Sequence, residues 1–158
     1  MLVSWLHVAA LIVYLGSLLA LWIVHLPALA KIADAREQAR LLAQKLRLYN
    51  PLQTATLGVL VLSGAFRLTE LKAAYRDQFA KALGAILAVK LTLAFFLIIL
   101  GVHQTMGVGL PFVRRYDAGE AVSAEDVAAV KRRLRLTMPA LLVLALLTAY
   151  MGLKMRGF

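Results

Sequence analysis

The sequence predicts an all-α membrane protein built as a single bundle of four transmembrane helices. Of its 158 residues, 62% are hydrophobic, and the mean hydropathy is +0.80. A soluble domain is typically about 45–50% apolar. The apolar residues gather in four runs, and a helix needs roughly 20 such residues to cross the hydrocarbon. Because lipid offers no hydrogen bonds to the backbone, each run is expected to be helical. We therefore expect one four-span domain over residues 1–158.

The four spans are expected at about residues 2–26, 51–68, 81–107 and 134–153. Proline lacks a backbone N–H and favours the first turn of a helix, whereas glycine is common just past the last turn. The residues that set the expected bounds are Pro27, Asn50-Pro51, Gly107, Gly109 and Pro111. On this interpretation the second span is short for a bilayer, and the fourth carries a proline in its early turns.

Two connections are amphipathic rather than apolar. The segment Lys31–Tyr49 places leucines on neighbouring faces, so we expect a helix that either continues out of the membrane or lies on its surface. Ser123 opens the motif SAED, which is typical of an N-cap followed by acidic residues in the first turn. It predicts a short connecting helix over Ser123–Arg135.

The net charge of +10 belongs to these connections, where basic residues set topology and contact anionic lipid, so a nucleic-acid partner is not expected. One side of the membrane receives Lys31, Arg36, Arg40, Lys45, Arg47, Arg114, Arg115, Lys131, Arg132, Arg133 and Arg135. The other receives Arg67, Lys72, Arg76, Lys81, Lys154 and Arg156. The positive-inside rule predicts a multi-pass protein of the cell inner membrane with both termini outside the cytoplasm.

Lys90 is the most informative single residue, because it lies inside an apolar run. A charge near mid-membrane costs at least about 2.5–3.5 kcal/mol, so it usually faces a partner or a cavity. His7, Tyr14 and His25 fall on one stripe of the first span, since about 700° and about 1800° of helix separate them. Polar groups that converge inside a bundle indicate a site.

The expected depths divide these groups into two clusters. His7 and Lys90, with Tyr14 deeper, form an outer cluster, and Lys90 is placed about 12 Å below the outer end of its span. His25 and His103 form an inner cluster, although an amphipathic ring near an interface can also simply meet water or headgroups.

Three functions are open from the residues alone. The chain has no cysteine, which removes disulfides, iron–sulfur clusters and thiolate ligands. Histidines on facing helices can bind a b-type haem, with the lysine meeting a propionate. Alternatively, His7 and His103 could bind copper with Met151 and Met155 at the outer end of the last span. The third possibility is a non-catalytic subunit of a larger membrane complex.

Several short motifs occur together, in order, over nearly the whole chain. They are Leu6-His7, the basic run before Asn50-Pro51, Ser63-Gly64, Lys90-Leu91 and Met138-Pro139. In this order and spacing the chain resembles the HemJ-type membrane protoporphyrinogen oxidases and, more loosely, the CopD-type copper-resistance membrane domain. It departs from the former in having Tyr14 where a tryptophan is expected, and in a slightly different spacing between Lys90 and His103.

The resemblance implies an oxidoreductase that converts protoporphyrinogen to protoporphyrin and passes electrons onward within the membrane. It implies that His7 binds a b-type haem or serves the redox site, and that Lys90 binds a porphyrin carboxylate or assists proton transfer. Tyr14 joins Lys90 as a catalytic candidate, and His25 and His103 join His7 as cofactor-binding candidates. Haem b is the expected cofactor with copper as the alternative, and a homo-oligomer or a membrane complex is the expected assembly.

Overall fold

The computed structural model describes residues 2–76 and 79–155, apart from the side chain of residue 82, and all of its regular elements are helices. In chain order they are α1 (Leu2–Leu19), the π-helix η1 (Ala20–His25), α2 (Leu26–Ala30), α3 (Ala35–Tyr75), α4 (Phe79–Val102), the π-helix η3 (His103–Gly109), α5 (Leu110–Asp117) and α6 (Ala124–Lys154). Within the described residues, four helical runs are long and apolar enough to cross a bilayer. The predicted all-α membrane bundle is confirmed.

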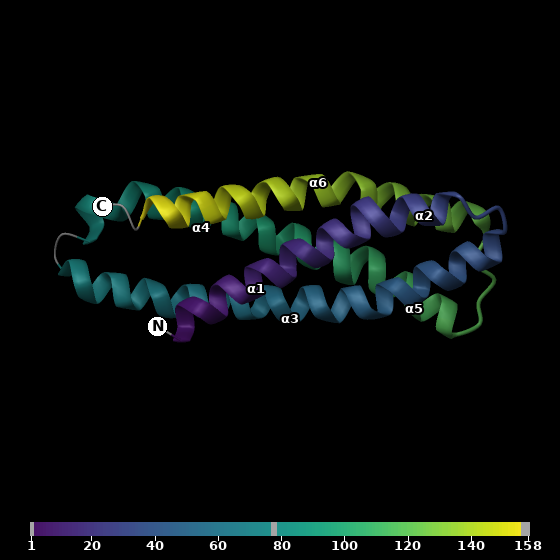
Figure 1. Cartoon of the computed structure of the whole chain (residues 1–158), viewed down its shortest axis with the longest axis horizontal. Helices are drawn as coiled ribbons and strands as arrows, with labels where there is room; N and C mark the ends of the chain where they lie inside the picture. Colours follow the sequence, from purple (N-terminus) through teal and green to yellow (C-terminus); the bar gives the residue numbers. More distant parts are fainter. Residues whose placement is uncertain (1, 77–78, 156–158) are drawn as a thin grey trace.

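The helices form an elongated bundle of two hairpins (Figure 1). α1 packs chiefly on α3, and α4 packs chiefly on α6. We call the end where α1 begins and α6 finishes the terminal end, and the end with α2 and α5 the basic end. At the terminal end the last turns of α3 and the first turns of α4 project past the start of α1 and the finish of α6 (Figure 1). This overhang affects how deep each side chain lies.

The helix start expected at Asn50-Pro51 is wrong, because Pro51 lies inside α3, which is continuous for 41 residues. An interior proline removes one backbone hydrogen bond and usually kinks a helix. Here Leu46 and Gln53, on either side of it, are buried, so packing of the neighbouring turns favours a continuous helix. The amphipathic segment Lys31–Tyr49 therefore continues helically out of the apolar belt. Pro139 lies inside α6 in the same way, and α6 begins at Ala124, well before the expected bound.

Two helices also do not end where expected: the first continues past Pro27 as α2, and the third continues through the π-helix η3 into α5. η1 leads directly into α2, which carries Pro27 in its first turn, and η3 leads into α5, which carries Pro111 there. A proline ring clashes with the carbonyl four residues earlier, and a π turn widens the backbone before that point. The two wide turns let both helices pass their proline instead of stopping at it.

The second half of the chain repeats the order of the first: an apolar helix, a π-helix, a short helix with Leu-Pro at its start, and a long capped helix. Asp34 caps α3 by accepting a hydrogen bond from the Arg36 backbone N–H at 3.2 Å. Ser123 caps α6 in a capping box with Asp126, so the predicted N-cap is confirmed. Caps of this kind satisfy backbone N–H groups that the first turn leaves unpaired.

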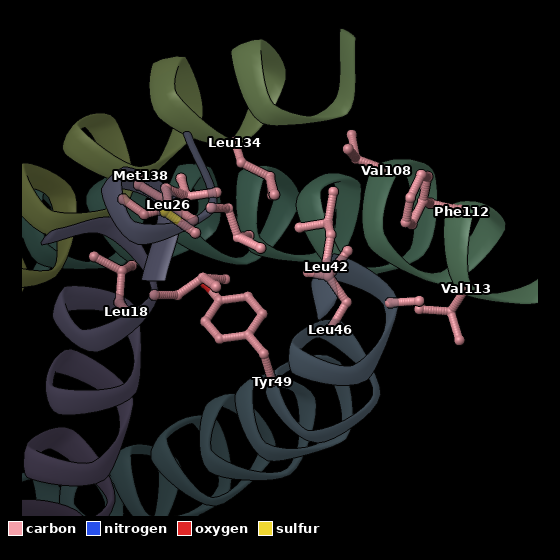
Figure 2. Close-up of a cluster of buried hydrophobic side chains, with 14 of the residues drawn as sticks. Leu18, Leu26, Leu42, Leu46, Tyr49, Val108, Phe112, Val113, Leu134 and Met138 are labelled. Atoms are coloured by element: carbon pink, nitrogen blue, oxygen red, sulfur yellow. The ribbon is translucent and has the colours of Figure 1, made fainter. Parts of the chain in front are cut away.

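The hydrophobic core is concentrated toward the basic end (Figure 2). Leu42, Leu46, Leu134 and Met138 are fully buried there, and the ring of Tyr49 lies beside them (Figure 2). Exposed ion pairs surround this core, and pairs of this kind contribute about 0–1 kcal/mol each. They are Glu37 with Arg40 (2.6 Å), Arg47 with Asp117, and Arg115 with Glu120 (2.9 Å) and Asp126 (3.4 Å). Apolar packing, more than the ion pairs, stabilises this end.

The two hairpins approach each other closely where α3 meets the end of η3. A methyl group at Gly109 would lie 2.8 Å from Asn50 Nδ2 and closer still to Oδ1. Both side-chain polar atoms of Asn50 are buried without a hydrogen-bond partner. Only a glycine at this position leaves room for the carboxamide.

Candidate functional site

The four spans share one level at Gly101, which provides a reference for depth. A methyl group at Gly101 would lie 3.3 Å from Leu57 Cδ2 of α3, 3.6 Å from the Tyr14 hydroxyl of α1 and 3.9 Å from Leu141 Cδ2 of α6. Leu57 is midway between Arg47 and Arg67, the charges that bound the apolar part of α3. Gly101 therefore marks the middle of the apolar belt.

This reference places Lys90 near the terminal end rather than at mid-membrane. Lys90 lies about 16 Å along α4 from Gly101, and the same distance along α3 from Leu57 reaches the turn of Arg67. A methyl group at Gly152, close to the finish of α6, would lie 3.3 Å from Lys90 Nζ. The prediction placed Lys90 deeper because depth was counted from the start of α4. That start belongs to the overhang, which projects past the other two helices.

His7 packs on α3 through Ser63. The distance from His7 Nδ1 to Ser63 Oγ is 2.8 Å, and Ser63 Oγ also lies 2.5 Å from the Val59 carbonyl oxygen. A carbonyl only accepts, so the single hydroxyl proton of Ser63 is donated to Val59 and the imidazole must donate from Nδ1. The ring also lies on Gly64, where a methyl group would be 3.7 Å from Cε1. This bonding places a proton on Nδ1 of the imidazole.

His7 and Lys90 share a similar depth but face different helices. His7 lies about 10 Å from the level of Tyr14 and Gly101, toward the terminal end, so it differs from Lys90 by about 6 Å in depth. The contacts described above place His7 on α3 and Lys90 on α6. The two residues of the expected outer cluster therefore lie at similar depths, each packed within its own hairpin.

Tyr14 belongs to a separate polar layer at the centre. The Gln53 side-chain N–H₂ donates to the Tyr14 carbonyl at 3.0 Å and to Ser17 Oγ at 2.7 Å. The Tyr14 hydroxyl is buried without a hydrogen-bond partner, beside a cavity of about 20 Å³ that Gln53 and Thr105 also line. A cavity of this size accommodates one water molecule. Tyr14 lies about 10 Å deeper than His7 and does not join its group.

The expected inner pair is not assembled. Measured from the level of Tyr14 and Gly101, His25 lies about 16 Å toward the basic end and His103 only about 3 Å, so they differ by about 13 Å in depth. His25 is half-buried at the end of η1, whereas His103 is exposed on the outside of the bundle. The prediction placed His103 near an interface because it ended the third helix at Gly107. In the structure the helical run continues to Asp117.

These positions test which metal or cofactor the residues fit. Two axial histidines must reach one iron, and the three histidines of the chain are separated in depth by at least about 13 Å. They do not fit a bis-histidine haem within one chain, but His7 fits a site with one protein ligand. The described residues contain no group of three or more His, Cys, Asp or Glu that could hold a metal ion. Of the thioethers considered for copper, Met155 is buried and Met151 half-buried at the terminal end.

Ser63 contacts His7, and Arg67 lies one turn further along α3; neither was singled out as a site residue. Ser63 was visible as a small hydroxyl residue inside an apolar run, and Arg67 as the first charge after it. These residues come to the level of His7 and Lys90 because α1 packs on α3. The sequence alone does not show which helices pack together. No protein-family model, curated protein or solved structure matches the chain, so the case for its function rests on the geometry around His7, Lys90 and His103.

Proposed function

We propose that the protein is an integral membrane redox protein that binds a porphyrin at its terminal end, with a b-type haem ligated by His7. The observation that carries the proposal is the bond between His7 and Ser63. Histidines that bind metals usually donate their other ring N–H to a second group, which fixes the tautomer and the orientation of the ring. In this proposal Ser63 accepts that hydrogen bond and Nε2 would bind the iron.

Two cations at the same level support the assignment of a porphyrin. Lys90 on α4 and Arg67 on α3 share the level one turn beyond His7, and a haem carries two propionates. Cationic side chains at the edge of the hydrocarbon suit carboxylates that lie at the headgroup level while the ring stays in the apolar belt. His7, which would bind the porphyrin iron, therefore lies deeper in the membrane than Lys90 and Arg67, which would bind the propionates.

The resemblance extends the proposal to the oxidation of protoporphyrinogen. Bound haem supplies one-electron redox chemistry. In this scheme His7 binds the iron, Ser63 holds the imidazole in place, and Lys90 and Arg67 position carboxylates. Tyr14 remains a candidate for proton transfer from the central polar layer. Since only His7 reaches this end, we propose one haem per chain.

The first test is the absorption spectrum of the protein purified in detergent. We expect a Soret band that shifts on reduction with dithionite, and we expect His7→Ala to lose most of the bound haem. Ser63→Ala keeps the imidazole but removes the acceptor of its Nδ1 proton. By comparison with other ligand-orienting groups, it should weaken haem binding by about 10–100-fold.

His25→Ala is the matched control, because it also removes a half-buried histidine of the first span but lies about 27 Å from His7 along that span. It should leave haem occupancy unchanged. Full occupancy in folded His7→Ala, checked by size-exclusion chromatography, would exclude His7 as the ligand and with it this proposal.

We also propose that the basic end faces the cytoplasm of a cell inner membrane, because most lysines and arginines of the connections gather there. Of the residues counted for the other side, Arg156 lies outside the described residues. The chain has no cysteine, so single-cysteine variants report topology directly. Glu70→Cys in the overhang should react with an impermeant maleimide in intact spheroplasts, and Glu120→Cys should react only after permeabilisation. The reverse pattern would invert the orientation.

A further inference from the structure

Three exposed arginines of α6 lie close to the middle of the apolar belt. They are Arg132, Arg133 and Arg135, which we call the arginine cluster. Leu141 of α6 lies at the level of Gly101, which marks the middle of the belt. Counted along α6 from Leu141, the cluster lies about 9–14 Å from that level, toward the basic end. Half of a typical hydrocarbon core is about 15 Å thick, so the cluster begins inside the hydrocarbon edge.

The charges of the other spans lie further out at this end. The first lysine or arginine is Arg47 on α3, about 15 Å from the middle, Arg114 on α5, about 20 Å away, and Lys31 after α2, about 25 Å away. Side chains of a helix lean toward its N-terminus, which for α6 is the basic end. The long arginine side chains of the cluster can therefore extend their guanidinium groups to the headgroup level.

The arginine cluster has no acidic partner in the part of the chain that the structure describes. None of its three guanidinium groups forms an ion pair there. Most acidic side chains of the basic end are engaged elsewhere. They are Asp34, the cap of α3, and the ion-paired Glu37, Asp117, Glu120 and Asp126. Glu125 lies about 10 Å from Arg132 along α6. The charge of the cluster is therefore not balanced within the bundle.

The cations of this segment also repel one another. Arg132 and Arg135 are three positions apart on one helix, where like charges are destabilising. Lys131 adds a fourth cation within five residues, and its Nζ donates a hydrogen bond to the neutral Gln38 side chain at 2.9 Å. At the hydrocarbon edge this repulsion is stronger than in water, because the dielectric constant is lower. An anion at the cluster would relieve it.

The surface beside the cluster indicates which anion fits. Leu136, Val143 and Leu147 are 71%, 54% and 42% exposed, and they lie within about 60° of Arg132 around α6. This apolar stripe runs from the cluster toward the middle of the membrane. A soluble anion would leave the stripe uncovered, whereas a phospholipid places acyl chains on it while its phosphate meets the guanidinium groups.

We propose that the arginine cluster binds the phosphate of an anionic phospholipid, whose acyl chains cover the stripe of Leu136, Val143 and Leu147. The planar guanidinium group suits phosphate oxygens because it can donate two parallel hydrogen bonds. A zwitterionic lipid such as phosphatidylcholine brings a cation of its own to a segment that already holds four. The site lies at the basic end and does not depend on the haem proposed at the terminal end.

The test uses the full chain in dodecyl maltoside, with dioleoyl phosphatidylglycerol as the probe and dioleoyl phosphatidylcholine as the comparison. The thermal midpoint is followed by fluorescence-detected size-exclusion chromatography. We expect phosphatidylglycerol to raise it by about 5–10 °C at about 100 times its Kd, and phosphatidylcholine to raise it much less. Arg132→Gln and Arg135→Gln should each raise the Kd for phosphatidylglycerol by about five- to tenfold.

Arg36→Gln is the matched control. It removes an exposed arginine from the same end, but from a position on α3 about 31 Å from the middle of the belt, so the Kd should not change. Without anionic lipid, the two α6 variants should be at least as stable as the parent, because each removes a like-charge repulsion.

Four outcomes would overturn the proposal. They are equal stabilisation by the two lipids, an equal loss of affinity in Arg36→Gln, equal stabilisation by glycerol 3-phosphate, which has no acyl chains, and an unchanged lipid response in Arg132→Gln together with loss of a co-purifying membrane protein. The last result would assign the arginine cluster to an acidic protein partner.

Discussion

Gly109→Ala is expected to destabilise the protein more than any other glycine substitution in the bundle. The new methyl group would lie 2.8 Å from Asn50 Nδ2 and closer to Oδ1, and Asn50 is held in a continuous helix. Overpacking in a well-packed interior costs about 1–3 kcal/mol and occasionally more. We expect a clear fall in the thermal midpoint of the detergent-solubilised protein, followed by fluorescence-detected size-exclusion chromatography.

Two controls identify the clash as the cause. Gly16→Ala and Gly58→Ala add the same methyl group where nothing lies within 4 Å, so they should be neutral or slightly stabilising. Asn50→Ala should cost little by itself, because the buried polar atoms of Asn50 have no hydrogen-bond partner. Combined with Gly109→Ala, it should restore most of the lost stability. If Gly109→Ala behaves like Gly58→Ala, then the two hairpins do not meet as described.

Leu46→Ala is expected to cost about 2–5 kcal/mol, the range for a leucine removed from a packed core. Leu46 has no exposed surface and lies in the cluster at the basic end (Figure 2). The charged rim indicates that this cluster extends beyond the hydrocarbon, where lipid cannot fill a cavity. The thermal midpoint and the yield of folded protein are the measurements.

Leu48→Ala is the control for this prediction. It removes the same side chain two positions along α3, but Leu48 is 72% exposed. Surface changes usually fall within about ±0.5 kcal/mol. Equal losses from the two substitutions would show that the face of α3 around Leu48 is covered in the assembled protein.

The spans and caps could be predicted because they depend on local composition. Four apolar runs and the Ser123 cap are visible in the sequence without knowledge of which helices touch. The prolines misled the prediction of helix ends, because proline is unfavourable in a helix only relative to the alternatives. In a long apolar run the alternative is an unsatisfied backbone in lipid, and packing on both sides of Pro51 favours a continuous helix.

The depth of the candidate residues could not be predicted for a different reason. Depth depends on how far each helix extends past its neighbours, which contacts such as Gly101 with Tyr14 and Gly152 with Lys90 determine. Lys90 seemed deep and His103 seemed shallow, and the contacts between helices reverse that order. The sequence did identify both residues, and His7 and Lys90 lie at similar depths on different helix pairs. Their chemical roles remain predictions.

The unbroken course of α3 has a mechanical consequence. Its first turns pack against α5 and α6 on one side of the membrane. Further along, Ser63 forms a hydrogen bond with the imidazole of His7. Because α3 is one continuous helix, a small tilt at its packed first turns would become a larger sideways displacement at Ser63, about 30 Å away. A tilt of α3 about its first turns would therefore displace Ser63 further than the turns that pack on α5 and α6.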